Sequence, residues 1–197
     1  SLKMIEKKDI TGIILAGGKS SRMGADKGFL KLNGKTFIEY SITAMKPLVS
    51  HIIIVSNNAD YDQFNLKRVE DLIKDSGPLA GLYSGLKASK TEYNLVLSSD
   101  IPLIRTEILN QLINECENNF DVIQIMSKNK SMPLIALYRK SCEKVFHHLL
   151  QNNERRLQVA VNQCKVKNIV LNPSLELFVT NINTPEDLEK MVYENKD

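Results

Sequence analysis

The chain has 197 residues, of which 43% are hydrophobic and 25% charged, with a formal net charge of +3. This composition is typical of a globular protein, and so small a charge gives no ground for expecting a nucleic-acid partner. No apolar run approaches the roughly 18 residues of a membrane helix, so we expect no membrane partner either.

The cysteines and histidines show no pattern that indicates a disulfide framework or a metal site. Cys116, Cys142 and Cys164 are widely spaced and form no CxxC motif, and their odd count favours reduced, structural thiols. Residues 1–9 contain no hydrophobic signal core. We expect a single domain over residues 1–197, with 1–9 a poorly ordered extension, in a cytoplasmic protein.

The first predicted element is a buried strand over about 10–15, because the run is short, apolar and β-branched. A long loop follows, which carries adjacent glycines and the cations Lys19, Arg22 and Lys27. Glycine allows backbone N–H groups to approach phosphates closely. The spacing fits neither the Walker A pattern nor G-x-G-x-x-G. An ordinary turn would not need so long a loop with embedded cations, so we expect it to hold a nucleoside triphosphate.

The next segment predicts a turn and a capped helix. Asn-Gly within 31–35 is a turn signal. Thr36 suits a helix N-cap, and Glu39 completes a capping box. The helix is expected to end near Lys46, before a proline.

Two strands and a glycine-containing helix are predicted next. The strands span about 51–58 and 67–71, and both end in polar residues. The helix opens at Gly77-Pro78, with proline suited to its first turn. Gly81 and Gly85 lie four apart, on one face. This pattern favours close packing of helix on sheet, and it is also consistent with a helix start that lies against a nucleotide.

A further buried strand over 94–100 ends on the acid Asp100, and Pro102 stops it. Ligands of open α/β sheets bind at the carboxyl ends of strands, so this acid is well placed to hold Mg²⁺. The structural alternative is that Asp100 caps the helix predicted over 107–117, a role that Thr106 would fill equally well.

After residue 120 the pattern changes to two consecutive strands followed by two helices. Arg155 and Arg156 stand at the start of the second helix, where cations oppose the macrodipole. A solvated surface and a phosphate site explain this pair equally well. The elements predicted here are strands over 121–126 and 133–138, helices over 141–152 and from 153, and a short edge strand over 166–171.

The C-terminal region predicts a helix with a clear start. Thr184 is the cap, Pro185 takes the first helical position and Asp187 stands three residues after the cap. Asn181 and Asn183 alternate just before it. Structure explains them less readily, and their amides could face a ligand.

The order of these elements predicts an α/β fold. Strands alternate with helices through residue 120, which indicates a Rossmann-like three-layer sandwich with a mostly parallel sheet. The strand pair after residue 120 predicts an antiparallel insertion near one edge.

The run Leu-Ala-Gly-Gly-x-x-x-Arg-Met-Gly-x-Asp-Lys over 15–27 resembles the signature of the molybdenum cofactor guanylyltransferases, within the wider nucleotidyltransferase group. The resemblance implies a nucleotidyltransferase-type fold, transfer of GMP from GTP to a molybdopterin-type cofactor, a requirement for Mg²⁺, and release of pyrophosphate. Transient contacts with cofactor-delivery proteins are also implied. The resemblance covers most of the chain and includes further motifs at Val69-Glu70-Asp71, Gly77-Pro78-Leu79-Ala80-Gly81, Asp100-x-Pro102, Glu154-Arg155-Arg156 and Asn181-x-Asn183-Thr184-Pro185-Glu186.

Site residues carried over from the family fall into three groups. Catalysis is assigned to Arg22, Lys27 and Asp100, and Asp100 is also the metal ligand. The acceptor is assigned to Arg155, Arg156, Asn181 and Asn183. The nucleotide is assigned to Leu15, Ala16, Gly17, Gly18, Lys27, Asn57, Asp71, Gly77, Pro78, Leu79 and Asp100.

The chain departs from the family pattern at two places. Ser99 stands where a cysteine is frequent. An asparagine expected at the end of the second strand aligns with either Val55 or Asn57, and Asn57 is preferred because valine offers no side-chain hydrogen bond.

The implied mechanism is in-line attack by the terminal phosphate of molybdopterin on the α-phosphorus of GTP, helped mainly by positioning and charge neutralisation. One rival is a cytidylyltransferase of the same fold that acts on molybdopterin or a sugar-like phosphate. Such relatives tend to have Leu-Ala-Ala-Gly, whereas Gly18 here leaves room for a purine. A second rival is a non-catalytic nucleotide-binding regulatory module, which would be expected to lack one of Arg22, Lys27 or Asp100.

Overall fold

The computed structural model describes residues 1–16, 19–20, 25–73 and 77–194. Its strands are β1 (Ile10–Leu15), β2 (Lys19–Ser20), β3 (Ala25–Asp26), β4 (Lys31–Leu32), β5 (Lys35–Thr36), β6 (His51–Val55), β7 (Lys67–Val69), β8 (Tyr93–Ser98), β9 (Val122–Ser127), β10 (Lys130–Arg139) and β11 (Val166–Val170). Seven of them form one sheet in the order β11-β9-β10-β8-β1-β6-β7, while β2-β3 and β4-β5 are small separate pairs.

The sheet is mostly parallel, as predicted. β1 lies between β6 and β8 and is parallel to both, and β7 is parallel to β6. β10 runs antiparallel to both β8 and β9, and β11 is parallel to β9. The antiparallel insertion is therefore one strand, β10, and it lies third from one edge of the sheet, which agrees with the predicted position near an edge. The strand predicted at the edge is β11.

Pro133 explains an irregularity in β10, the antiparallel strand. Proline has no N–H to donate, so within sheets it is found at edges and bulges. The register between β10 and β9 shifts between Met132 and Ala136, around this proline. The bulge allows β10 to continue to the interior of the sheet despite the missing donor.

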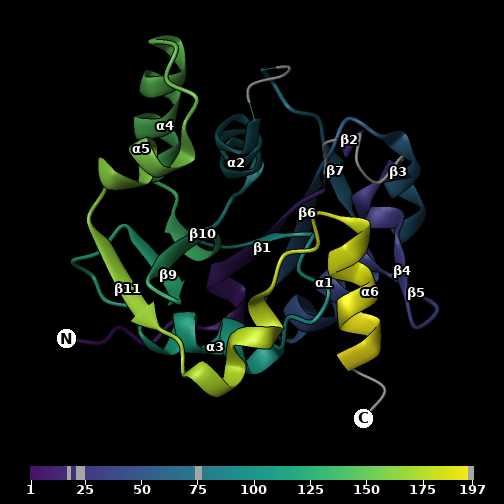
Figure 1. Cartoon of the computed structure of the whole chain (residues 1–197). Coiled ribbons are helices and arrows are strands. Elements are labelled where there is room, and N and C mark those ends of the chain that lie inside the picture. Colours follow the sequence, from purple (N-terminus) through teal and green to yellow (C-terminus); the bar gives the residue numbers. More distant parts are fainter. Residues whose placement is uncertain (17–18, 21–24, 74–76, 195–197) are drawn as a thin grey trace.

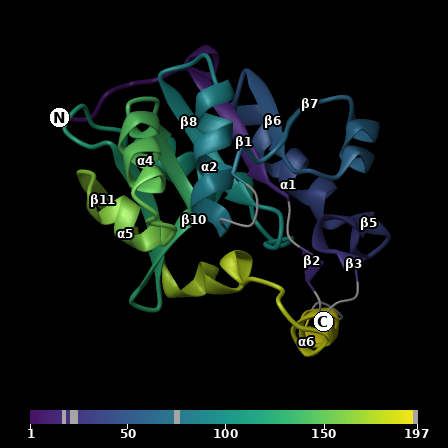
Figure 2. The same cartoon turned by 90° about the horizontal axis from the view of Figure 1, so that it is seen from above.

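Helices cover both faces of the sheet, which gives three layers (Figures 1 and 2). The α-helices are α1 (Phe37–Met45), α2 (Gly77–Ala88), α3 (Thr106–Asn114), α4 (Cys142–Gln151), α5 (Leu157–Asn162) and α6 (Pro185–Glu194). Short 3-10 helices are η1 (Lys7–Asp9), η2 (Lys27–Phe29), η3 (Lys46–Leu48), η4 (Ala59–Phe64) and η5 (Pro173–Val179).

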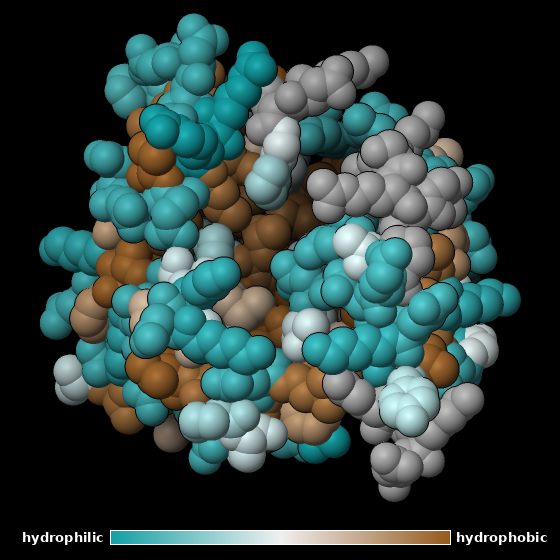
Figure 3. Space-filling view, viewed as in Figure 1, coloured by the Kyte–Doolittle hydropathy of each residue, from teal (hydrophilic) through white to brown (hydrophobic). Residues whose placement is uncertain are grey.

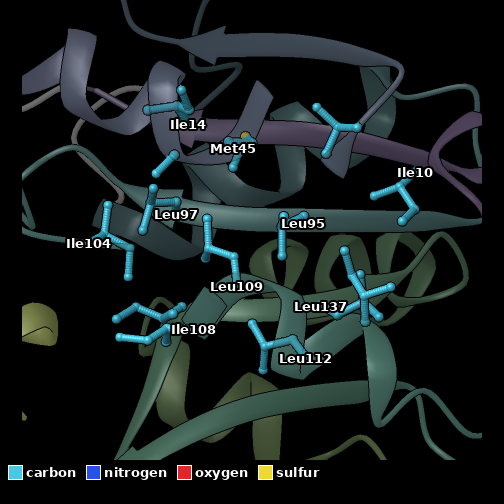
Figure 4. Close-up of a cluster of buried hydrophobic side chains, with 14 of the residues drawn as sticks. Ile10, Ile14, Met45, Leu95, Leu97, Ile104, Ile108, Leu109, Leu112 and Leu137 are labelled. Carbon is cyan, nitrogen blue, oxygen red and sulfur yellow. The ribbon is translucent and has the colours of Figure 1, made fainter. Parts of the chain in front are cut away.

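Alternate residues of the central strands enter two different cores. Ile14 packs with α1 and α3 on one face, where Met45 and Leu109 also lie (Figure 4). Ile13 packs with α2 and α4 on the other face. Both isoleucines are fully buried, as expected for a parallel strand covered on both sides. A Cβ on Gly85 of α2 would lie 2.6 Å from Ile13 Cγ2, so this glycine serves close packing of helix on sheet.

The local cap and turn predictions are confirmed at three places and wrong at one. Thr36 and Glu39 form the capping box of α1. The β4-β5 turn has Asn33 and Gly34 at positive φ, as an Asn-Gly hairpin requires. Thr184 Oγ1 accepts the Asp187 N–H at 3.1 Å at the start of α6.

The start of α3 differs from both alternatives considered. Its N-cap is Arg105, which makes no side-chain cap bond. Thr106 instead donates its hydroxyl to the Ala44 carbonyl of α1 at 2.8 Å, because the packing of α1 against α3 brings that carbonyl within reach. Neither Asp100 nor Thr106 therefore caps this helix.

Leu2 makes an isolated antiparallel bridge with Glu117. The three cysteines are free, with Cys116 and Cys142 buried. Within the described ranges, no helix combines the length and apolar character needed to span a membrane.

Candidate active site

Several of the predicted site residues lie where β1, β6 and β8 end. Leu15, Val55 and Ser98 are paired across these strands at the same edge of the sheet. Just beyond them, Ala16 N–H donates to Val55 O and Ser99 N–H donates to Leu15 O, both at 3.0 Å. The three chain segments that leave these strands therefore start side by side, at the edge where ligands of parallel sheets bind.

A hollow opens on this part of the surface. Figure 3 shows it between α5 and α6, with a hydrophobic floor and polar residues along part of its rim. The hollow lies in front of the strands seen in the same view in Figure 1. An apolar floor with a few polar groups is the usual form of a small-molecule site.

Asp100 follows β8 and is largely enclosed. Its Oδ1 has no hydrogen-bond partner in the described part of the chain, although it is shielded from solvent. Burial raises the pKa of this carboxyl, while the Ser98 hydroxyl and the Lys27 charge partly oppose that rise. A shielded carboxylate oxygen without a donor is costly unless a cation or a proton meets it. Asp100 thus fits the metal-ligand role assigned to it.

The C-terminal segment lies against this acid and against Lys27. Ile182 N–H donates to the backbone oxygen of Asp100 at 2.8 Å. Asn183 Oδ1 accepts from Lys27 Nζ at 3.1 Å. Lys27, Asp100 and Asn183, from three distant parts of the sequence, are therefore brought together. Asn181 lies exposed two residues before Asn183.

A second group of predicted residues lies beyond β6. Asn57 Oδ1 accepts the Asp71 N–H at 2.8 Å. A Cβ on Gly81 of α2 would have Leu15 Cδ2 at 3.6 Å and Asp71 Oδ2 at 4.0 Å. Val55 packs in the core against α2, whereas Asn57 is exposed, which favours Asn57 over Val55 as the contact residue.

At the start of α2, a nucleotide would meet mainly backbone atoms. Gly77 has φ of +72°, a conformation that favours glycine, and both Gly77 and Pro78 are exposed. Leu79 is fully buried in the core. Its side chain is therefore not available to a nucleotide, and its predicted contact is restricted to backbone atoms. Ala16 is likewise buried, and its N–H is already bonded to Val55.

Arg155 and Arg156 precede α5, and Glu154 accompanies them. Glu154 Oε1 accepts from Arg156 Nη2 at 2.8 Å, and Glu154 Oε2 accepts both arginine backbone N–H groups. These bonds, led by the Arg156 guanidinium, lower the pKa of Glu154 to about 2. The carboxylate explains how an arginine pair is tolerated at a helix start. Within the described ranges, no hydrogen bond or ion pair joins Arg155 or Arg156 to Lys27.

Three predicted residues, Gly17, Gly18 and Arg22, lie outside the described residues. Asp26 was not among the predicted site residues, and the structure places its carboxylate in a network with Tyr61 and Asn58. The preference of aspartate for turn starts was the available signal, but nothing local identified Tyr61, which lies 35 residues further along the chain.

Known proteins resemble this chain over nearly its whole length. Residues 12–165 match the family model described as MobA-like NTP transferase domain. A probable molybdenum cofactor guanylyltransferase from Flavobacterium johnsoniae is 36% identical over 184 residues, covering 92% of this chain and 96% of that protein. A relative of the same name from Carboxydothermus hydrogenoformans is 35% identical over 190 residues, covering 94% of this chain and 96% of that protein.

A solved structure shows the same fold. The molybdopterin-guanine dinucleotide biosynthesis protein A from Archaeoglobus fulgidus matches with a TM-score of 0.80 at 23% identity, covering 94% of this chain and 98% of that one. At 23% identity, this similarity is evidence for the fold alone.

Proposed function

This chain belongs to the family of MobA-like NTP transferases, and on that basis we propose that it transfers GMP from GTP to the molybdenum cofactor and releases pyrophosphate. Curated relatives that carry this activity in their names align along more than nine-tenths of the chain. The observation that carries the proposal is the meeting of Lys27, Asn183 and the shielded Asp100 at the carboxyl edge of the sheet.

The transfer is an in-line displacement at phosphorus. A terminal phosphate oxygen of the acceptor forms a bond to the α-phosphorus of GTP. The bond from that phosphorus to the bridging oxygen breaks, and pyrophosphate leaves with the electron pair. The acceptor phosphate is already ionised near neutral pH, so the reaction needs positioning and charge neutralisation more than a strong base.

Lys27 supplies positive charge next to the leaving pyrophosphate. Its ammonium donates to Asn183 Oδ1 at 3.1 Å, and its charge acts on Asp100, whose burial-raised pKa it partly lowers. Charge fixed in place before the reaction stabilises a transition state more effectively than solvent does. Arg22, from the same loop, is proposed to share this role. Asn57, Asp71 and the start of α2 would hold the nucleoside.

Asp100 is the residue proposed to hold Mg²⁺, which would neutralise charge on the phosphate oxygens when bound. The shielded, unpartnered Oδ1 of Asp100 fits such a cation. Within the described ranges, no group of three or more His, Cys, Asp or Glu side chains converges as a ready-made metal cage. Mg²⁺ does not require such a cage, because in proteins it usually binds one or two carboxylates and completes its coordination shell with water and substrate phosphates.

The acceptor is proposed to bind in the hollow, next to the nucleotide. Asn183 and Asn181 would line one side, and Arg155 and Arg156 the other. We further propose that residues 1–197 act as one domain, that the reaction takes place in the cytoplasm, and that the product is passed on through transient contacts with delivery proteins.

The nucleotide and the transfer are tested together. Thermal unfolding is measured with Mg²⁺ and each of GTP, CTP, ATP and UTP, and GMP transfer is followed with GTP labelled at the α-phosphate. GTP at about 100-fold excess over its Kd should stabilise the protein by about 2.7 kcal/mol, while the other nucleotides should not. Label should appear in the dinucleotide cofactor.

A midpoint shift with CTP alone would contradict the guanine assignment and indicate a cytidylyltransferase. GTP binding without any transfer of label would indicate a regulatory module instead.

A further inference from the structure

The carboxylate of Asp26, the residue before Lys27, is held by three donors. Its Oδ1 accepts from Gly28 N–H at 3.2 Å and from Tyr61 Oη at 2.5 Å. Its Oδ2 accepts from Asn58 Nδ2 at 3.3 Å. The carboxylate therefore ties the backbone around Lys27 to the segment that follows β6.

Tyr61 is committed to this bond by its surroundings. The residue is fully buried, and its ring stacks on Phe29 of η2 with centroids 4.4 Å apart. Burial, helped by the Asp26 carboxylate, raises the pKa of Tyr61 far above its ordinary value, so the hydroxyl keeps its proton. A buried hydroxyl that lost its acceptor would bear the full cost of desolvation. The two side chains therefore hold each other in place.

Gly28 provides independent evidence that the Tyr61 hydroxyl needs the space next to Asp26. A Cβ on Gly28 would overlap Tyr61 Oη. Gly28 is not among the glycines at positive φ in the described ranges, so its backbone does not require glycine. The missing side chain serves the close approach of the tyrosine hydroxyl.

The hydrogen bonds of the Asp26 carboxylate connect two parts of the candidate site. On one side, Lys27 donates to Asn183 Oδ1, and its charge partly lowers the burial-raised pKa of the largely enclosed Asp100. On the other side, Asn58 is adjacent to Asn57, whose side chain fixes the backbone of Asp71. Between these sides the backbone is β3 and the short η2, which offer little regular hydrogen bonding of their own. Side-chain hydrogen bonds must therefore fix the distance between these two parts of the site.

We propose that Tyr61 and Asp26 are positioning residues for nucleotidyl transfer, and that their hydrogen bond sets where the Lys27 ammonium stands against the triphosphate. The inference rests on the proposed function, because it takes Lys27 as the residue that meets the phosphates. Displacing a catalytic group by about 1 Å can cost a large factor in rate, so losing one hydroxyl remote from the reacting atoms should be measurable.

The test is Tyr61→Phe, which removes the hydroxyl and keeps the ring. We expect kcat/KM for GMP transfer to fall about tenfold and GTP binding, measured by calorimetry, to weaken severalfold. Tyr138→Phe is the matched control. Tyr138 is equally buried and donates to Pro133 O at 2.6 Å, but it pairs with Asn94 near the start of β8, away from the site.

The control separates positioning from general stability. Tyr138→Phe should lose comparable thermal stability and keep GTP binding and kcat/KM within about twofold of wild type. Equal functional losses in Tyr61→Phe and Tyr138→Phe would overturn the proposal.

A double-mutant cycle tests whether Tyr61 acts through Lys27. In a Lys27→Ala background, Tyr61→Phe should weaken GTP binding no further. A full additional loss there would overturn the inference. If the wild type binds GTP but transfers no GMP to the cofactor, the proposed function fails, while the binding cycle still decides the role of Tyr61.

Discussion

At the scale of single residues, the site is defined by a few polar groups whose partners differ. Lys27 and Asn183 satisfy each other at 3.1 Å. Asp26 has three donors, whereas Asp100 keeps a shielded oxygen without one. A fully bonded carboxylate stabilises the fold, and an unsatisfied one is available to a ligand. This contrast separates the structural acid of the loop from the acid proposed to bind metal.

Asp100→Asn should lower turnover strongly and stabilise the nucleotide-free protein. Burial raises the pKa of Asp100 in the fold above its unfolded value, so its favourable contribution is complete only below the unfolded pKa. That contribution is lost as the pH rises through the folded pKa, and the ionised carboxylate is destabilising near neutral pH. The amide carries no charge and avoids this cost.

The measurements are turnover and the thermal midpoint across pH. Turnover should fall by about 100-fold or more. The midpoint of Asp100→Asn should exceed that of wild type at neutral pH, and the difference should vanish in acid. A lower midpoint at neutral pH would contradict this account of Asp100.

At the scale of elements, caps and close contacts decide where helices begin and how they pack. The capping box of α1 contains two bonds of 2.7 Å to Glu39 Oε2, from the Thr36 hydroxyl and from its N–H. These bonds lower the pKa of Glu39, with the Thr36 hydroxyl the largest cause. α1 supports one face of the central strands, so its start affects the layer beneath the site.

Thr36→Ala should lower the free energy of unfolding by about 1 kcal/mol, or roughly 2–4 °C in Tm. A lowered folded pKa gives a contribution that is present above the unfolded pKa of Glu39 and is lost as the pH falls through the folded pKa. The difference between Thr36→Ala and wild type should therefore shrink in acid, as measured by denaturant unfolding across pH.

The control is Thr43→Ala, an exposed position on the same helix. It should stay within about 0.5 kcal/mol of wild type. A loss at position 43 that matches the loss at position 36 would show that the cap is not responsible.

At the scale of the whole molecule, the candidate site is assembled by the return of the C-terminal segment to Lys27. The bond from Lys27 to Asn183 spans 156 residues of sequence. Ile182, between the two asparagines, is fully buried with Phe37 and Met191 and holds this segment in place. The parallel strands supply a common edge, and the returning segment closes it beside α6 (Figure 1).

Ile182→Ala should cost about 3 kcal/mol of stability, because it leaves a cavity in a fully packed cluster. It should also lower turnover at a temperature where the protein is folded, because Asn183 would no longer be held against Lys27. Met191→Ala is the control, since Met191 belongs to the same cluster and its loss should cost similar stability. Equal turnover in the two variants would contradict a positioning role for Ile182.

The sequence by itself determined much of the local structure and the end of the sheet at which the candidate site is expected. The strand over 10–15, the box of Thr36 and Glu39, and the cap at Thr184 depend on interactions within a few residues, so spacing and residue type predicted them. The carboxyl ends of parallel strands share one edge, and this placed Asp100 near the first loop before any distance was known.

Tertiary structure decided the features that depend on partners distant in sequence. The position of β10 inside the sheet, the hydroxyl of Thr106 on Ala44, and the hydroxyl of Tyr61 on Asp26 follow from packing that no local pattern encodes. The same holds for the contact of Asn183 with Lys27. A side chain with several acceptors within chemical reach bonds to the one that the packed fold brings closest, and only the folded chain fixes that distance.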